Sequence, residues 1–183
     1  MKKILVVVDM QNDFITGPFG TPEAVAIVDK VVEKIRGEEW DYVFTTQDCH
    51  DMKYLDSQEG KKLPVKHCVV GTDGWRIKDR VWDALNERDF MDTFKYSFGD
   101  EYLPMDIREK IIRSDGYFDD GDLELTLVGV CTDICVISNA LLLKAHYPEM
   151  KIVVDAACCA GSSPEIHRMA LEVMKSCQID ILN

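Results

Sequence analysis

The sequence predicts an α/β fold, a Rossmann-like three-layer α/β/α sandwich around a mainly parallel sheet of about six strands. Strand-like apolar runs alternate with helix-like stretches along the whole chain, which favours crossover connections and a parallel sheet between two helical layers. Residues 3–9 form a continuous aliphatic run ending in Asp9, typical of a strand buried on both faces. With no linker or internal repeat, we expect residues 1–183 to form a single domain.

Each expected element has a local signal. Thr21 and Pro22 suit the N-cap and first position of a helix over residues 22–37, which ends at Gly37. Residues 48–75 show no period, and loops of such length are usually functional or disordered. The other expected helices have apolar residues at helical spacing and cover residues 77–85, 104–112, 134–146 and 164–176. The other expected strands are apolar or β-branched and cover residues 42–47, 93–96, 123–130, 152–155 and 179–182.

Composition excludes several classes of protein. The 21 basic and 33 acidic residues give a formal charge of −12 with no basic run, which argues against nucleic acid and anionic membranes as partners. No apolar stretch approaches the roughly 20 residues of a spanning helix, and no secretory signal is visible, so we expect a cytoplasmic protein. Seven cysteines, an odd number, make a disulfide framework improbable. Cys158, Cys159 and Cys177 are expected to serve as small apolar packing groups.

Four chemically capable residues follow predicted strands. Asp9, Asp48, Lys95 and Cys135 stand at or just beyond strand carboxyl ends, the edge where parallel α/β sheets bind ligands. Cys135 also opens a helix, whose dipole would favour the thiolate and lower the thiol pKa. Asp9 could take the thiol proton while Lys95 balances both negative charges. Taken singly, the three are equally explained as a turn residue, a solvated lysine and an inert packed thiol.

A second group of residues suits a metal ion. Asp48 and His50 are two residues apart in an extended segment and therefore face the same side, and His67 could complete a site with two imidazoles and one carboxylate. Such a set suits a divalent metal, zinc first, with iron or manganese as alternatives. Glu59 is a further candidate ligand, direct or through water. The alternative is two solvated loop histidines and a turn aspartate, because Asp-x-His is a common pattern.

Three segments resemble the signature blocks of the isochorismatase-like cysteine hydrolases, spaced as in that family. They are Asp9-Met-Gln-Asn-Asp-Phe14, Lys95-Tyr-Ser-Phe98 and Gly129-Val-Cys-Thr-Asp-Ile-Cys135-Val. The resemblance implies that Asp9, Lys95 and Cys135 are the catalytic aspartate, lysine and nucleophilic cysteine. It also implies a cis peptide bond before Cys131, with the Cys131 and Cys135 amides forming an oxyanion hole. The family further implies a homo-oligomer, a dimer or a tetramer.

The two histidine segments narrow the resemblance. Asp48-Cys-His50 followed by His67-Cys-Val-Val-Gly-Thr-Asp-Gly74 is similar to the metal-binding part of the nicotinamidase branch. This implies hydrolysis of nicotinamide, or a related small aromatic amide, to the acid and ammonia. His146 and His167 match no block and are expected to be structural.

The chain departs from the nicotinamidase branch at the pocket expected to hold the pyridine ring of the substrate. Members of that branch often carry an aromatic residue shortly before the second histidine, where this chain has Leu63-Pro-Val-Lys66. Phe14 supplies one expected aromatic wall, and Trp75, Tyr96 or Phe98 could supply another, although each could equally pack in the core.

Two rival functions remain open. One is a sister activity of the same hydrolases on an N-carbamoyl or ureide compound, with a vestigial metal site. The other is a catalytically silent binding or redox-sensing protein in which Cys131 and Cys135 respond to oxidation, although a disulfide between them would be strained.

Overall fold

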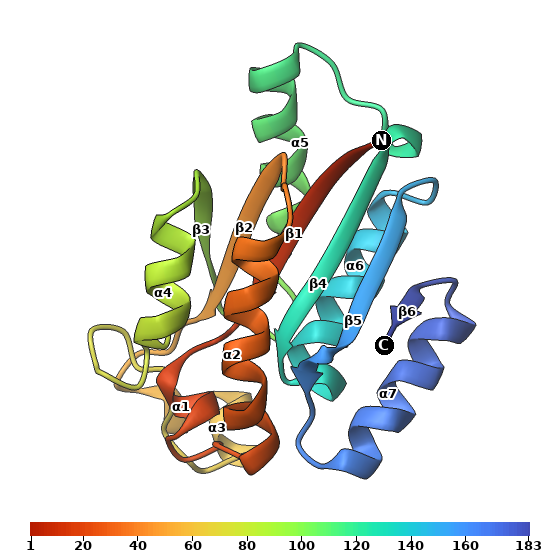
Figure 1. Ribbon diagram of the computed structural model, residues 1–183. Coiled ribbons are helices and arrows are strands. Elements are labelled where there is room, and N and C mark those ends of the chain that lie inside the picture. The colour runs from red at the N-terminus through yellow and green to blue at the C-terminus, as the bar shows by residue number, and fades with distance from the viewer.

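The structure, a computed structural model, describes all residues from Met1 to Asn183. At its centre is a six-stranded sheet in the order β3-β2-β1-β4-β5-β6, in which every neighbouring pair is parallel (Figure 1). The strands are β1 (Lys2–Val8), β2 (Tyr42–Asp48), β3 (Phe90–Lys95), β4 (Leu123–Val130), β5 (Lys151–Ala160) and β6 (Asp180–Leu182). The predicted α/β sandwich is confirmed.

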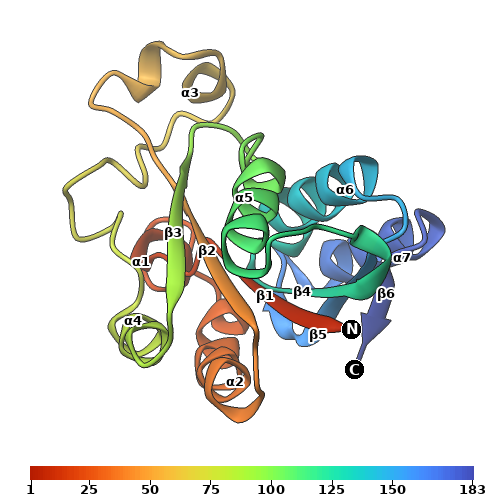
Figure 2. The ribbon, with the colours of Figure 1, turned by 90° about the horizontal axis from the view of Figure 1, so that it is seen from above.

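Helices cover both faces of the sheet, as Figure 2 shows from above. One face carries α1 (Asn12–Ile15), α2 (Pro22–Gly37) and α4 (Asp79–Asn86). The other face carries α5 (Leu103–Asp115), α6 (Ile137–His146) and α7 (Pro164–Ser176). The remaining helical segments are short: η1 (Tyr54–Asp56), α3 (Gln58–Lys62), η2 (Asp120–Asp122) and the π-helical turn η3 (Thr132–Val136). None of these helices combines the length and apolar character that crossing a membrane requires.

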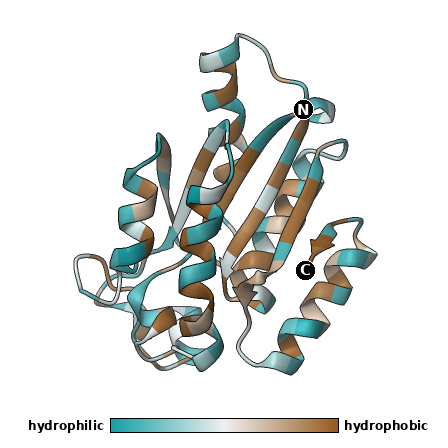
Figure 3. Ribbon diagram, viewed as in Figure 1, coloured by the Kyte–Doolittle hydropathy of each residue, from teal (hydrophilic) through white to brown (hydrophobic).

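Alternation along β1 explains why the sheet is buried on both faces. Ile4, Val6 and Val8 pack with α5, α6 and α7, whereas Leu5 and Val7 pack with α2 and α4. The brown strands of Figure 3 show the same apolar centre. Burying an aliphatic side chain of this size contributes roughly 1.5–3 kcal/mol, so the strands hold the two helical layers together.

Several boundaries differ from those expected. β5 continues to Ala160 instead of ending at residue 155, because its small residues resume pairing with β4 after a register shift between Leu127 and Gly129. β3 begins at Phe90, earlier than expected. The irregular stretch 48–75 contains η1 and α3.

All seven cysteines are free thiols. Cys158 and Cys159 are buried, as expected of packing groups, but Cys177 is exposed because it lies just beyond the end of α7. The expectation that Cys177 packs as an apolar side chain is therefore wrong.

Asp92 on the edge strand β3 supports a prediction about pH. Gln47 Nε2 donates a 2.8 Å hydrogen bond to Asp92 Oδ2, whereas Oδ1 is buried without a partner. Burial raises the pKa of Asp92 to about 6, against the opposing hydrogen bond. A carboxyl whose pKa is higher in the folded chain destabilises the fold once it ionises, so this cost is absent below pH 4 and complete above pH 6.

We therefore expect Asp92→Asn to raise the free energy of unfolding by roughly 1–3 kcal/mol at pH 8 and by almost nothing at pH 4. Urea unfolding of both proteins across this range measures the difference. A gain of equal size at both pH values would contradict the assignment.

Candidate functional site

The carboxyl ends of the four strands β3, β2, β1 and β4 meet at one edge of the sheet. The chain runs from β1 to β2 on one side, and β4 lies on the other side of β1, so strand order reverses here. Asp9 directly follows β1, Asp48 ends β2, Lys95 ends β3, and Cys135 lies in η3 after β4. The sequence-based expectation that these four residues share an edge is confirmed.

Lys95 is the centre of this edge. Its Nζ lies 2.8 Å from Asp9 Oδ2, 3.3 Å from Asp48 Oδ1 and 3.5 Å from Cys135 Sγ. It also donates a 3.1 Å hydrogen bond to the carbonyl of Ser97. Only 2% of Lys95 is exposed, so its charge acts on its neighbours with little screening by water. We call Asp9, Lys95 and Cys135 the thiol cluster.

Backbone geometry brings the thiol cluster together. Asp9 has a φ of 49°, a left-handed conformation that Asp tolerates better than most residues, and Thr46 Oγ1 donates a 2.7 Å hydrogen bond to its Oδ1. Gly129 has a φ of 120°, and a Cβ there would lie 2.1 Å from the carbonyl oxygen of Val8. Only glycine therefore allows β4 to approach the end of β1 so closely.

Burial and charge set the protonation of the thiol cluster. Burial would lower the pKa of Lys95, but the negative charges of Asp9, Cys135 and Asp48 raise it well above its ordinary value. Burial raises the pKa of Asp9, although the charge of Lys95 opposes the shift. Burial, and then the charge of Asp9, raises the pKa of Cys135 well above that of a free thiol. Lys95 is therefore an ammonium, and Asp9 is a stronger base than an exposed aspartate.

The expected lowering of the Cys135 pKa by a helix N-terminus is wrong in its direction. Cys135 does lie just ahead of α6, within η3. However, it is 5% exposed and shares its surroundings with Asp9, and the loss of hydration outweighs the helix dipole. The resting sulfur is consequently a thiol, and its ionisation requires transfer of its proton to a neighbouring base.

The bond between Val130 and Cys131 is cis, as the family resemblance implied. It stands directly between β4 and η3, where the amides of Cys131 and Cys135 follow the strand end. Burial raises the pKa of the Cys131 thiol to about 12.

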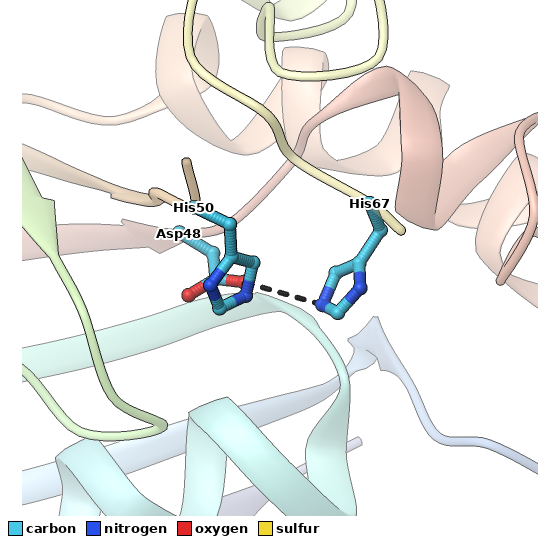
Figure 4. A group of neighbouring side chains, drawn as sticks. All are labelled: Asp48, His50 and His67. Carbon is cyan, nitrogen blue, oxygen red and sulfur yellow. Dashed lines mark ion pairs between the residues drawn. The ribbon is translucent and has the colours of Figure 1, made fainter. Parts of the chain in front are cut away.

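Asp48, His50 and His67 point toward one another, as Figure 4 shows, and we call them the donor group. They lie beside the thiol cluster, because Asp48 Oδ1 is 3.3 Å from Lys95 Nζ. Their ligand atoms all lie within 4.8 Å of one another. Asp48 Oδ2 is 2.9 Å from His50 Nε2 and 3.5 Å from His67 Nε2. Burial alone would raise the pKa of Asp48, but the two imidazoles and the Lys95 ammonium hold it well below its usual range. This carboxylate therefore stays ionised.

The donor group fits a divalent cation. His50 Nε2 is buried, and Asp48 Oδ2, although 2.9 Å away, is not aligned with it for a hydrogen bond. His67 Nδ1 lies 3.0 Å from the carbonyl oxygen of Val65, which only accepts, so Nδ1 carries a proton. A cation that displaces the proton from Nε2 would therefore meet a lone pair on that nitrogen. Two imidazole nitrogens and one carboxylate then face a common point, a ligand set that binds divalent metals.

Glu59 and Tyr54 border the donor group. Glu59 Oε1 is 3.7 Å from His50 Nε2 and 3.9 Å from His67 Nε2. Tyr54, which sequence reasoning missed, packs on His50 with ring centroids 4.5 Å apart, and its hydroxyl lies 3.4 Å from Glu59 Oε1. An isolated tyrosine in an aperiodic loop gives no signal by which this role could have been found.

A cavity of about 400 Å³ joins the thiol cluster to the donor group. Phe14 and Phe98 line it, as expected of wall residues, together with Cys131, Cys135, Asp48, His67 and Glu59. Trp75 instead stacks on Phe94 outside this cavity, and Tyr96 is 78% exposed, so neither forms a wall.

Phe19 and Leu63 complete the apolar lining. The Phe19 ring lies 4.8 Å from that of His67 and 6.3 Å from that of Phe14. Leu63 lines the cavity from the segment in which an aromatic residue was missing. Sequence reasoning overlooked Phe19 because it stands in a glycine-flanked turn without hydrophobic periodicity.

Comparisons with known proteins agree with this architecture. The family model of the Isochorismatase domain matches residues 3–183. PncA of Bacillus subtilis (strain 168), described as an uncharacterized isochorismatase family protein, is 28% identical over 183 aligned residues, covering 93% of each chain. The crystal structure of nicotinamidase/pyrazinamidase PncA from Bacillus subtilis has a TM-score of 0.81 at 27% identity, covering all of both chains. Pyrazinamidase of Pyrococcus horikoshii in complex with zinc has a TM-score of 0.76 at 27% identity, covering 100% of this chain and 99% of that one.

The fold and the relatives that it matches define a hydrolytic enzyme. The chain belongs to the isochorismatase family, because the family model spans nearly its whole length.

Proposed function

We propose that this chain is a metal-assisted amidase of the nicotinamidase type, which hydrolyses nicotinamide to nicotinate and ammonia through a thioester. The observation that carries the proposal is the shared cavity, which is lined by Cys135, by Asp48 and His67 of the donor group, and by phenylalanine side chains. Relatives named as nicotinamidase and pyrazinamidase support the same conclusion.

The thiol cluster supplies the chemistry of acylation. Asp9 takes the Cys135 proton, since burial raises the pKa of this carboxyl and it acts directly on the Cys135 thiol by its charge and by a hydrogen bond. The sulfur then attacks the amide carbon, and the amides of Cys131 and Cys135 stabilise the oxyanion. As the C–N bond breaks, protonated Asp9 gives its proton to the departing ammonia. Lys95 keeps the two negative groups compatible throughout.

Deacylation uses the same residues. Asp9, ionised again after ammonia leaves, accepts a proton from water, whose oxygen attacks the thioester carbon. The C–S bond breaks, and the proton on Asp9 returns to the Cys135 sulfur. The released acid and the thiol complete the balance, so the cycle consumes only water and amide.

The donor group would hold a divalent cation, zinc first and iron or manganese as alternatives, through Asp48, His50 and His67. Bound there, the cation would orient the substrate by binding its ring nitrogen, a positioning role rather than a nucleophile-generating one. Glu59 is the fourth candidate ligand, direct or through water. The zinc complex of the Pyrococcus pyrazinamidase supports this choice of metal.

Ammonia release from a substrate panel tests the proposed function. Nicotinamide and pyrazinamide should release ammonia, and an N-carbamoyl amine and a ureide should not. Activity confined to the carbamoyl compounds would assign the chain to the sister activity instead. The homo-oligomer and the cytoplasmic location stay predictions, and sedimentation measures the first of them.

His50→Ala is expected to lower metal content because it removes one of the three donors. We expect at least about 10-fold weaker metal binding by titration calorimetry, because the loss of even an outer partner of a metal ligand typically costs about 10–100-fold in affinity. His146→Ala is the matched control, since His146 lies in the last turn of α6. Unchanged metal stoichiometry and affinity in His50→Ala would remove the site as described.

A further inference from the structure

The segment that carries the Cys131 and Cys135 amides is held from outside by the turn between β5 and α7. Val130 pairs with Ala160, the last residues of β4 and β5, so the chain leaves the two strands side by side. The cis bond follows one strand and Gly161 follows the other. A Cβ at Gly161 would lie 2.7 Å from Asp133 Oδ1, so the two turns approach as closely as glycine allows.

Two side-chain pairs join these turns. Asp133 accepts two 2.8 Å hydrogen bonds, one from the backbone amide of Ser162 and one from its hydroxyl. Thr132 is fully buried, and its Oγ1 lies 2.8 Å from His167 Nδ1 on α7. The hydroxyl donates to a bare Nδ1 and accepts from a protonated one, so this bond forms with either tautomer. We call the pairs Asp133–Ser162 and Thr132–His167 the clamp.

The turn that carries Ser162 is attached to α7, which is packed in the core. Ser163 caps α7 by accepting a hydrogen bond from the amide of Ile166, and the amide of His167 donates to the carbonyl of Ser163 at 2.9 Å. Leu171 and Met174 then anchor α7 in the core beneath the sheet. The turn is therefore fixed to a packed helix rather than to a free loop.

Hydrogen bonds within η3 and a link to α6 give further support to this turn. The amides of Ile134 and Val136 both donate 3.0 Å hydrogen bonds to the carbonyl oxygen of Cys131. These two bonds close the turn on itself.

Asn139 Nδ2 on α6 donates a 2.9 Å hydrogen bond to the carbonyl oxygen of Cys135, and Asn139 Oδ1 accepts one from the amide of Asp100. The Cys135 end of the turn is therefore held by α6, whereas Thr132 and Asp133 are held by the clamp. Oxyanion donors act only when they are held close to hydrogen-bonding distance from the developing charge, so their placement needs a contact outside the turn.

We propose that the clamp positions the Cys131 and Cys135 amides for the oxyanion, which makes Thr132, Asp133 and His167 positioning residues for the reaction. This inference rests on the proposed function. It gives His167, which the sequence suggested to be merely structural, a role in transition-state stabilisation. The clamp acts on the oxyanion and not on the bound amide. Its loss should therefore weaken binding of the oxyanion and leave binding of the unreacted amide unchanged.

The test compares two ligands. Pyridine-3-carbaldehyde forms a C–S bond with Cys135 as the carbonyl electrons move to oxygen and the thiol proton passes to Asp9, so its affinity reports the oxyanion site. Nicotinamide binding to proteins that also carry Cys135→Ala reports ground-state binding. Thr132→Val removes only the hydroxyl and keeps the shape, and Thr132→Ser restores the hydroxyl.

Thr132→Val should weaken aldehyde binding and lower kcat, each by about 10-fold or more, with nicotinamide affinity within about twofold and Thr132→Ser recovering most of both losses. Asp133→Asn, which replaces one acceptor oxygen, should also weaken aldehyde binding. This variant provides the test if Thr132→Val does not fold. Equal loss for both ligands, or no loss for either, would overturn the clamp. Failure of the unmodified protein to form any aldehyde adduct would instead refute the thiol chemistry, and the clamp with it.

Discussion

Replacing Cys135 with alanine is expected to abolish ammonia release, lowering kcat/KM by at least about 10⁴-fold, as loss of a nucleophile does in other covalent hydrolases. The reason is that this sulfur lies within 3.5 Å of Lys95 and shares that ammonium with Asp9. Without the sulfur no thioester forms. Continuous ammonia detection measures the loss, and mass spectrometry of quenched reactions measures the missing acyl adduct.

The matched control is Cys159→Ala, which removes another buried thiol, on β5. It should keep most of the activity, which separates loss of the nucleophile from loss of packing. Metal content should be equal in all three proteins, since Cys135 is outside the donor group. Substantial turnover by Cys135→Ala would contradict covalent catalysis.

Lys95→Met is expected to lower the free energy of unfolding by about 3–5 kcal/mol and to remove activity. The methionine has a similar length but no charge, so Asp9 and Asp48, which are 0% and 5% exposed, lose the cation between them. Asp9 is then a buried carboxylate without a cation, and it is repelled by Asp48, which keeps only its two imidazole neighbours. Because domains of this size are stable by only about 5–15 kcal/mol, urea unfolding should show the change clearly.

A double variant tests this explanation. Lys95→Met combined with Asp9→Asn removes the uncompensated charge of Asp9 and should recover part of the lost stability without any activity. If the double variant were no more stable than Lys95→Met alone, repulsion between the carboxylates would not explain the loss.

The sequence predicted what depends on strand order and local pattern. Alternating apolar strands and capped helices were sufficient for the sandwich, and the strand ends placed Asp9, Asp48, Lys95 and Cys135 together because parallel strands share one carboxyl edge. The donor group was predicted by the resemblance of the two histidine segments to the nicotinamidase branch, since the Asp48-x-His50 spacing alone is a common pattern. The length of β5 was missed because its alanines and cysteines have no strand propensity of their own and pair only in the context of β4.

What the sequence could not predict depends on burial and on distant contacts. The direction of the Cys135 pKa shift depends on how completely the sulfur is buried and on its distance from Asp9, neither of which a helix-start pattern contains. Phe19 and Tyr54 enter the site from aperiodic turns. His167 and Thr132 are separated by 35 positions in the sequence, and no local pattern predicts such a pairing.

The thiol cluster and the two metal-binding histidines come from different segments of the chain, and this affects how substrate preference can change. The thiol cluster belongs to β1, β3 and the turn after β4, whereas His50 and His67 belong to the excursion that begins after β2. Asp48 alone participates in both, through Lys95 on one oxygen and the imidazoles on the other. Changes in that segment can therefore alter which amide is bound, while the thiol cluster that breaks the bond stays unchanged.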